Sequence, residues 1–459
     1  MLNICDIKPN SKIYMLGIGG ISMSALALML KTRGKTVKGY DRARSETTDM
    51  LQANGIEVFF DFDASRAADC DLIVYSAAFG NSHPVFKSAA SLGLPLYSRA
   101  ELLGAIAAEH RNSVAVAGTH GKSTTSGMLG HIFLQAKGCD PTVVVGAVMR
   151  EVGSTYRIGT DDNFIFEACE YRDSFLSFFP RIAVVLNISL DHTDYFKDMD
   201  QMRDSFVRFM NNTGKDGYAV FNYDCAESRL AASEHIGINV SFSASGSEKA
   251  DYCARNVKEN GGYAVYDVYR HGEYYITLKL GAPGEHNVSN SLAAVAVCDI
   301  CGISKEDIVN GIAGFKGVGR RFEYKGRLNG AAVYDDYAHH PEEIKATLST
   351  AKEIAGKGRV FCVFQPHNYS RLHDLYGDFI TAFDKADKLI LCPLYAARGS
   401  DGGEVSSETL ASEINGALYM DSYPAITDLL RKEAAPEDVI LIVGAGDIAD
   451  YAAKFGEKS

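Results

Sequence analysis

Short apolar runs that end in glycine or polar residues recur along the chain, and helix-like stretches lie between them. The first run is KIYML (12–16), and the glycine turn after it opens an apolar stretch that ends at Gly34. TVKGYD (36–41) and DLIVYSAA (71–78) repeat the pattern. Alternating strands and helices are typical of βαβ units, in which the strands are parallel. We therefore predict a first α/β domain over residues 1–107.

The same alternation continues in two further segments. The segment 108–316 contains the runs SVAVA, NFIFEA and IAVVLNI, which end at polar residues as buried parallel strands do. Its stretch GYAVYDVYRHGEYYITLKL predicts hairpins at a sheet edge. Residues 315–326 (FKGVGRRFEYKG) have the glycine and charge content of a linker. The segment 317–459 adds AAVYDDYAHHP, RVFCVFQP, KLILCPLY and VILIVGAG, so we predict an α/β protein of three domains.

Composition narrows the class of protein. Hydrophobic residues make up 46% of the 459 residues, which excludes a disordered chain. The formal net charge is −12 with both signs intermixed, which argues against a nucleic-acid partner. No apolar run reaches the ~18 residues of a membrane span, and the first residues lack the pattern of a signal peptide. The ten cysteines are scattered singly apart from Cys298 and Cys301, so we expect reduced thiols and a cytoplasmic protein.

The glycine-rich turn GIGGISMSA (17–25) lies between a predicted strand and a predicted helix. Gly19 and Gly20 would let the backbone approach a diphosphate at the helix N-terminus, and Asp41 ends the next strand, where an acid that binds ribose would lie. Ser22 replaces the last glycine of the dinucleotide motif. The turn predicts binding of a nucleotide or a UDP-type diphosphate. Strand-to-helix packing alone and an NAD-dependent dehydrogenase are the alternatives.

A second glycine-containing turn, GTHGKST, follows the strand SVAVA. Val116 stands where the strict P-loop has glycine, but the ending GKS is intact, and dehydrogenases lack it. The lysine can reach β- and γ-phosphates, and the serine hydroxyl can bind Mg²⁺. A regulatory ATPase without ligase activity would carry the same motif. We predict a phosphate cradle formed by Gly118, Thr119, His120, Gly121, Lys122, Ser123 and Thr124.

Polar side chains follow the next predicted strands. Glu167 ends NFIFE and His192 follows IAVVLNI, so both are expected at the carboxyl edge of one parallel sheet, beside the cradle. A carboxylate and an imidazole there could complete Mg²⁺ ligand shells, and ordinary loop structure is the alternative. Asn287 and Asn290, in HNVSN before an alanine-rich helix, could pair with an adenine edge or cap that helix.

Charged residues gather in the third segment. DDYAHHP (335–341) offers two carboxylates and two imidazoles, among them Asp336 and His339. A metal site, hydrogen bonding to a nucleotide or substrate, and a solvated loop are all compatible with this cluster. Domain closure could bring linker arginines onto a nucleotide phosphate. The remaining candidates are His367 and Arg371 after the strand RVFCVFQ, and Arg320 and Arg321 in the linker.

The order of the motifs resembles that of the Mur ligases of peptidoglycan synthesis, over essentially the whole chain. The motifs are GIGGISMSA, AGTHGKST, EACEYRDS, NISLDHTD, GEHNVSN, GRRFE, DDYAHHP, FQPHNYSR and IVGAGDI. The resemblance implies a Rossmann-like N-terminal domain for a UDP substrate, a central P-loop ATPase-like domain with a mostly parallel sheet, and a Rossmann-like C-terminal domain.

The resemblance also implies an ADP-forming amide ligation with Mg²⁺ as cofactor. DDYAHHP and FQPH are similar to members that join L-alanine to UDP-N-acetylmuramate. In that reaction ATP phosphorylates the muramyl carboxylate, the amine of alanine attacks the acyl phosphate, and phosphate leaves. A murein-recycling member that attaches a preformed peptide shares most motifs and is the alternative. Asn368 and His373 stand where arginines are common in the family, and a monomer or homodimer is expected.

Roles for individual residues follow from the resemblance. Catalytic roles are implied for Lys122, Glu167, His192 and His339, and metal binding for Ser123, Glu167 and His192. Contacts to ATP are implied for the cradle and for Asn287, Asn290, Arg321 and Asp336. Contacts to the UDP substrate are implied for Gly19, Gly20 and Asp41, and near its muramyl group for Thr119, His120, Glu170 and Ser174. The alanine pocket is implied to contain Tyr337, His367 and Arg371.

Overall fold

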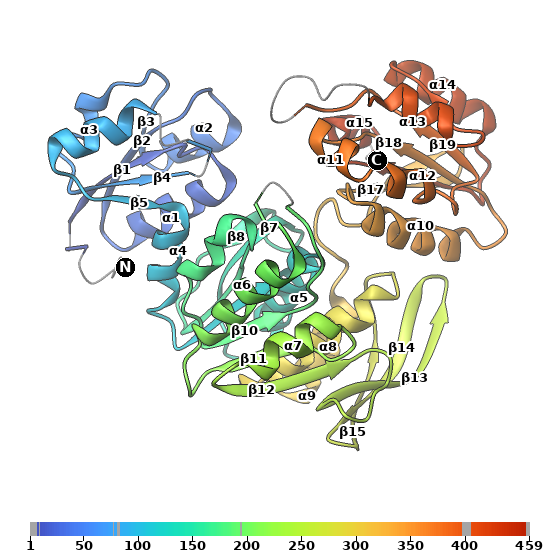
Figure 1. Ribbon diagram of the computed structural model, residues 1–459, viewed down its shortest axis with the longest axis horizontal. Helices are drawn as coiled ribbons and strands as arrows, with labels where there is room; N and C mark the ends of the chain where they lie inside the picture. The colour runs from blue at the N-terminus through green and yellow to red at the C-terminus, as the bar shows by residue number, and fades with distance from the viewer. Residues whose placement is uncertain are drawn as a thin grey trace. The chain divides into compact units, whose positions relative to one another are not determined.

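The computed structural model describes residues 7–8, 10–76, 78–79, 83–192, 195–396 and 405–455. Residues 193–194, at the end of the motif NISLDHTD, lie outside them. The chain forms two compact units, one of residues 1–253 with 292–311 and one of residues 254–291 with 312–459 (Figure 1). The described residues contain three sheets whose strands are mostly parallel, which confirms the predicted α/β class.

The first sheet is fully parallel, with the strand order β3-β2-β1-β4-β5. Three of its strands were predicted, whereas β3 and β5 were not, because three residues are too few to show a period. The strands are β1 (Lys12–Leu16), β2 (Thr36–Tyr40), β3 (Glu57–Phe59), β4 (Leu72–Tyr75) and β5 (Leu96–Ser98). The helices are α1 (Ile21–Thr32), α2 (Glu46–Ala53), η2 (Ala64–Ala67), α3 (Pro84–Leu92) and α4 (Arg99–Ala107).

The second sheet has the strand order β15-β14-β13-β12-β11-β10-β6-β9-β7-β8. The pairs from β13 through β6 to β7 are parallel, and the edge pairs β14–β15 and β7–β8 are antiparallel. The predicted hairpin at a sheet edge is thereby confirmed. The strands are β6 (Asn112–Ala117), β7 (Thr142–Met149), β8 (Ser154–Arg157), β9 (Asn163–Glu167), β10 (Ile182–Val185), β11 (Tyr218–Asn222), β12 (Ile238–Ser243), β13 (Tyr252–Asn260), β14 (Tyr263–Arg270) and β15 (Glu273–Lys279).

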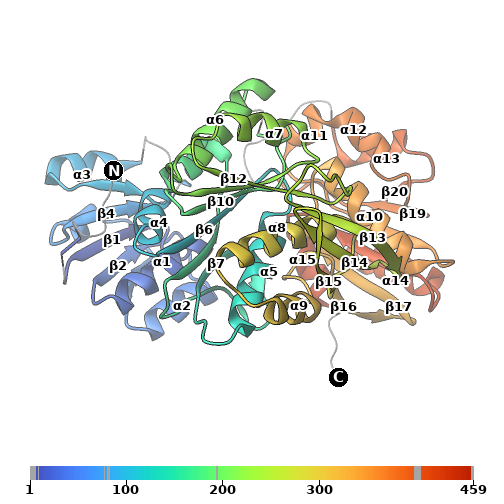
Figure 2. The same ribbon diagram turned by 90° about the horizontal axis from the view of Figure 1, so that it is seen from below.

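Helices cover both faces of the second sheet. Helix α5 (Lys122–Gln135) lies on one face, and α6 (Met199–Asn211) and α7 (Ala226–Ser233) lie on the other (Figure 2). Ala115 of β6 and Phe206 of α6 belong to one apolar cluster, which also includes side chains of α4. The first two sheets therefore share a core. The other helical elements here are η3 (Tyr171–Ser177), α8 (His286–Ile300) and α9 (Lys305–Gly314).

The third sheet has the order β16-β17-β21-β18-β19-β20, and only its edge strand β16 pairs antiparallel. Separate apolar clusters cover its two faces. The strands are β16 (Glu323–Leu328), β17 (Ala331–Asp336), β18 (Val360–Phe364), β19 (Lys388–Leu391), β20 (Leu418–Tyr419) and β21 (Val439–Val443). The helices are α10 (Pro341–Ala355), α11 (Tyr369–Asp374), α12 (Tyr376–Thr381), α13 (Ser407–Glu413), α14 (Tyr423–Glu433) and α15 (Ile448–Ala453).

The structure corrects the end of the predicted linker. The predicted linker 315–326 is wrong at its end, because Glu323–Leu328 forms β16 and pairs with β17, where Tyr324 packs against Tyr334.

In the parts of the chain that the structure describes, no helix is long and apolar enough to cross a membrane.

The topology of the second sheet brings three polar segments to one edge. Strand β6 lies between β9 and β10, and all three are parallel. In the register, Val116 of β6 lies opposite Glu167 of β9, and Ala117 lies opposite Val185 of β10. The turn after β6, the end of β9 and the loop after β10 are therefore neighbours at the carboxyl edge, where ligands of parallel sheets bind.

Helix α4 packs so closely on η3 that a methyl group at Gly104 has no room. An alanine Cβ at this position would lie 2.1 Å from the backbone oxygen of Ser177. We expect Gly104→Ala to lower stability by about 1–3 kcal/mol, as overpacked sites do. The loss of stability is measured from the midpoint of urea unfolding, followed by circular dichroism. Gly377→Ala in α12 is the control, because nothing lies within 4 Å of its Cβ position. Equal midpoints for the two variants would contradict this packing.

Candidate active site

The turn between β6 and α5 has the backbone of a phosphate cradle. Gly118 and Gly121 have φ of +138° and +85°, values that L side chains rarely adopt, and α5 begins at Lys122 directly after them. The backbone N–H groups of a helix N-terminus attract phosphate. Glycine at these two positions is therefore required by the backbone, and the missing glycine at Val116 does not prevent the turn.

The loop after β10 braces the cradle. Thr119 donates its hydroxyl to the oxygen of Ser189 at 2.9 Å and accepts the Ser189 N–H at 3.0 Å. Asn187 accepts the N–H of His120 at 2.8 Å and donates its amide to the His120 oxygen at 3.1 Å. These contacts hold the turn in one shape. They also use the hydroxyl of Thr119, a residue for which the resemblance implies a contact with the muramyl group.

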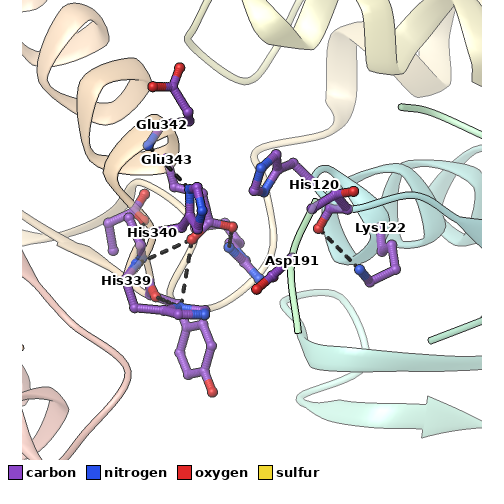
Figure 3. Close-up of polar contacts among 12 residues, drawn as sticks. His120, Lys122, Asp191, His339, His340, Glu342 and Glu343 are labelled. Atoms are coloured by element: carbon purple, nitrogen blue, oxygen red, sulfur yellow. Dashed lines mark hydrogen bonds and ion pairs between the residues drawn. The ribbon is translucent and has the colours of Figure 1, made fainter. Parts of the chain in front are cut away.

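Lys122 folds back over the cradle (Figure 3). Its Nζ lies 2.5 Å from the oxygen of Gly118, 3.1 Å from the oxygen of Thr119, and 3.1 and 3.2 Å from the carboxylate oxygens of Glu170. Burial favours the neutral amine, but the carboxylate of Glu170 acts in the opposite direction, and the pKa of Lys122 is raised above its ordinary value. Lys122 is therefore a cation at neutral pH.

Glu167 is fixed by a neighbouring strand. Its Oε1 accepts the N–H of Gly146 in β7 at 2.5 Å, and an alanine Cβ at Gly146 would lie 3.0 Å from the carboxylate. The sequence analysis missed Gly146. Its signal was a glycine inside the apolar strand TVVVGAVM, which often marks a close approach to the backbone. The hydrogen bond from Gly146 orients the Glu167 carboxylate toward β7, and a side chain at position 146 would crowd it.

His192 lies beside Glu170 rather than in a ligand cluster. Its Nε2 is 3.7 Å from a carboxylate oxygen of Glu170, and its ring is 4.7 Å from that of Tyr171. Ser123 is buried in the first turn of α5. No group of three or more His, Cys, Asp or Glu side chains within the described ranges could hold a metal alone. The carboxylate of Glu167 and the hydroxyl of Ser123 are oxygen ligands of the kind that Mg²⁺ prefers, and in nucleotide sites this ion takes its other ligands from phosphates and water.

The glycine-rich turn after β1 is closed by its own hydrogen bonds. Gly17 and Ile18 both donate their N–H to the oxygen of Tyr40, and Gly20 donates to the oxygen of Gly17. The N–H of Gly19 donates to Asp41 Oδ2 at 2.8 Å. The Asp41 carboxylate is therefore hydrogen-bonded to the backbone of the glycine-rich turn. A cluster of rings that the sequence analysis did not single out lies nearby and consists of Tyr40, Phe62, Phe79 and His83.

Asn287 and Asn290 lie inside a helix rather than before it. Helix α8 begins at His286, so the predicted capping position is wrong. Both side chains are buried, and the Asn290 amide donates to Asn287 Oδ1 at 2.9 Å. The Asn287 amide donates to the oxygen of Pro283 at 2.6 Å. The two side chains are brought together as expected, one turn apart, and each fixes the orientation of the other.

Asp336 and Tyr337 organise the end of β17. Asp336 accepts the N–H groups of Phe322 at 2.8 Å and Ala338 at 2.7 Å, and burial raises its pKa despite the opposing effect of Arg321. The guanidinium groups of Arg320 and Arg321 lie 4.9 and 5.2 Å from the ring centre of Tyr337. Both arginines are therefore held against β17, where sequence reasoning gave them a mobile linker.

His339, predicted as a catalytic residue just before α10, lies near two residues of the predicted alanine pocket, His367 and Arg371, which follow β18. The rings of His339 and His367 are 6.1 Å apart, and Arg371 Nη1 lies 3.4 Å from His367 Nδ1. The carbonyl oxygen of Tyr337 accepts a hydrogen bond from His339 Nδ1 at 3.0 Å, and the backbone N–H of His339 donates to Glu343 at 3.1 Å (Figure 3). Burial lowers the pKa of His339, so its imidazole is neutral at neutral pH.

Tyr395 completes this cluster and was missed from the sequence. Its ring stacks on His367 at 5.8 Å, and its backbone oxygen accepts the N–H of Asn368. Tyr395 follows β19 in an irregular stretch, so no periodicity marked it. Asn368, one of the departures from the family pattern, has φ of +66°, an uncommon backbone conformation for a residue with a side chain.

Known protein families match nearly all of this architecture. The profile "Mur ligase family, catalytic domain" matches residues 12–111, "Mur ligase middle domain" matches residues 116–298, and "Mur ligase, glutamate ligase domain" matches residues 320–446. Among solved structures, the UDP-N-acetylmuramate–alanine ligase of Thermotoga maritima aligns with a TM-score of 0.80 and 27% identity, over 97% of this chain and 98% of that one. A murein peptide ligase of Psychrobacter arcticus shares the fold, with a TM-score of 0.70 and 22% identity over 97% and 98%.

Curated relatives extend the match in sequence. The UDP-N-acetylmuramate–L-alanine ligase of Clostridium kluyveri is 42% identical over 449 residues, which are 96% of this chain and 97% of the relative. That of Clostridium perfringens is 42% identical over 444 residues, 96% of each chain. Identity of this extent over nearly the full length, together with the three profiles and the shared fold, shows that the chain belongs to the Mur ligase family.

Proposed function

We propose that this protein joins L-alanine to UDP-N-acetylmuramate with cleavage of ATP to ADP, a step of peptidoglycan precursor synthesis. The observation that carries the proposal is a half-buried, charged Lys122 in a phosphate cradle, within a chain 42% identical over 96% of its length to a ligase of that name. The preserved GKS ending and the position of α5 support ATP as the phosphate donor.

The chemistry needs activation of a carboxylate. A muramyl carboxylate is anionic and has no good leaving group, so an amine does not attack it. Transfer of the γ-phosphoryl group forms a carboxyl oxygen–phosphorus bond and releases ADP. The amine of L-alanine then bonds to the carbonyl carbon, and phosphate leaves with the former carboxyl oxygen. Lys122 is proposed to offset the repulsion between the carboxylate and the γ-phosphate.

Ser123, Glu167 and His192 are the proposed Mg²⁺ ligands. When bound with ATP, the ion would neutralise phosphate charge and orient the transferred group. The position of Glu167 at the carboxyl edge beside the cradle supports this role, and the hydrogen bond from Gly146 orients its carboxylate. As the resemblance implies, Glu167 would hold a first Mg²⁺ ion and His192 a second.

The remaining roles are proposed as the resemblance implies them. The cradle residues Gly118 to Thr124, Asn287, Asn290, Arg321 and Asp336 would bind ATP. Gly19, Gly20 and Asp41 would serve the UDP end, and Thr119, His120, Glu170 and Ser174 the muramyl group. Tyr337, His367 and Arg371 would form the alanine pocket, and the neutral His339 would accept a proton from the amine. We propose domains at 1–107, 108–316 and 317–459 in a cytoplasmic monomer or homodimer.

Phosphate release from ATP tests the proposal. UDP-N-acetylmuramate is present, and each amino acid or the stem tripeptide is added singly. Release that requires both the sugar nucleotide and L-alanine is expected. Release only with the tripeptide would make the protein a recycling ligase, and release that depends on neither would leave an ATPase without ligation.

Replacing Lys122 should separate catalysis from substrate binding. Lys122→Ala removes the cation that offsets charge repulsion, and we expect turnover to fall by at least about 10³-fold. Binding of UDP-N-acetylmuramate, measured by calorimetry, should stay within about twofold. Lys137→Ala, at an exposed position after α5, is the matched control. Loss of sugar-nucleotide binding in Lys122→Ala would show that the UDP site has been assigned to the wrong part of the chain.

Replacing Glu167 should change the response to Mg²⁺. Glu167→Gln keeps the size of the side chain but loses the charge, so we expect half-maximal activity at about tenfold or more higher Mg²⁺ concentration. The measurement is the initial rate across a Mg²⁺ titration at saturating ATP. Glu109→Gln, at an exposed position before β6, should titrate like the unchanged protein. An unshifted curve for Glu167→Gln would remove this carboxylate from the metal site.

A further inference from the structure

Glu170 has surroundings that contact with a substrate does not explain. Its side chain is fully buried, with 0% exposure, whereas that of Lys122 is 17% exposed. Both of its oxygens lie within 3.2 Å of Lys122 Nζ. A carboxylate without access to water is costly unless a cation pairs with it. Lys122 is that cation here.

The ammonium of Lys122 has no unused hydrogen. An ammonium donates three hydrogen bonds. In this structure the acceptors are the oxygens of Gly118 and Thr119 and the carboxylate of Glu170. A phosphate that approaches Lys122 must therefore displace one of them. Glu170 is the only anion among the three, and it would repel the phosphate as long as both shared the same cation.

We propose that Glu170 is a positioning residue for Lys122. It holds the ammonium, charged and folded over the cradle, while no nucleotide is bound. When a triphosphate enters, Lys122 exchanges Glu170 for the β- and γ-phosphate oxygens. The inference rests on the proposed function, since it requires ATP at this cradle. It replaces the contact with the muramyl group, which the resemblance implies for Glu170, by a role in phosphate binding.

The exchange predicts a specific change in nucleotide affinity. In Glu170→Gln the neutral amide no longer competes with phosphate for Lys122. ATP should therefore bind about three- to tenfold more tightly, the size expected for one charge-assisted contact. AMP lacks the β- and γ-phosphates, so its affinity should not change. The ratio of the two dissociation constants thus isolates the effect at Lys122 from any general effect on the site.

Calorimetric titration of the full chain in EDTA measures this ratio without metal and without turnover. A ratio that rises in Glu170→Gln supports the exchange, and an unchanged ratio overturns it. An unchanged ratio together with a higher KM for UDP-N-acetylmuramate would return Glu170 to the substrate. Glu234→Gln, at an exposed position after α7, should match the unchanged protein. If Glu170→Gln does not fold, Glu170→Asp is used. Its carboxylate is withdrawn by one methylene, so the ratio should rise less, and no rise overturns the inference.

The two proposals fail in different ways. ATP binding with the predicted ratio but no alanine-dependent phosphate release would remove the ligase function and keep the role of Glu170. Alanine-dependent phosphate release, together with an unchanged ratio of the ATP and AMP dissociation constants, would keep the ligase function and remove the role of Glu170. Absence of ATP binding to the unchanged protein would overturn both.

Discussion

The buried ion pair between Lys122 and Glu170 is the constraint on which the central half of this protein depends. Lys122 is the first residue of α5, where the helix dipole already places positive charge. A second positive charge there, cut off from most solvent, requires an anion close by. The carboxyl edge of the second sheet supplies it as Glu170, because β9 and the segment after it lie next to β6. The parallel strand order therefore places the anion that pairs with Lys122 next to the cradle.

Charged side chains also fix the C-terminal part of the chain. Each oxygen of Asp336 accepts a backbone N–H, one from the segment before β16 and one from the turn after β17. The ring of Tyr337 lies against two guanidinium groups from that same segment. Arg321 is thus oriented by a carboxylate and a ring that are themselves held in place. A segment that looks like a flexible connector in sequence is, in the structure, an ordered border of the third sheet.

Local signals in the sequence predicted the cradle, most of the longer strands and the position of Glu167. Each of these depends on residues that are adjacent in sequence or on the rule that parallel strands end at one edge. The contacts that orient the side chains were not predictable in this way. Gly146 meets Glu167 across 21 positions, and Glu170 meets Lys122 across 48. Tyr395 reaches His367 from an irregular stretch without period, and the start of α8 was missed because asparagine is more common before a helix than inside it.

The closed turn after β1 bears on which cofactors the first sheet can accept. In dinucleotide-binding enzymes the glycine turn offers its amides to the pyrophosphate. Here the four N–H groups from Gly17 to Gly20 are each donated to an oxygen of the protein itself. The turn keeps the outline of a dinucleotide site but presents none of those four donors. Any diphosphate bound at this turn, that of a UDP substrate included, must therefore either displace these internal hydrogen bonds or be held by donors other than the four amides.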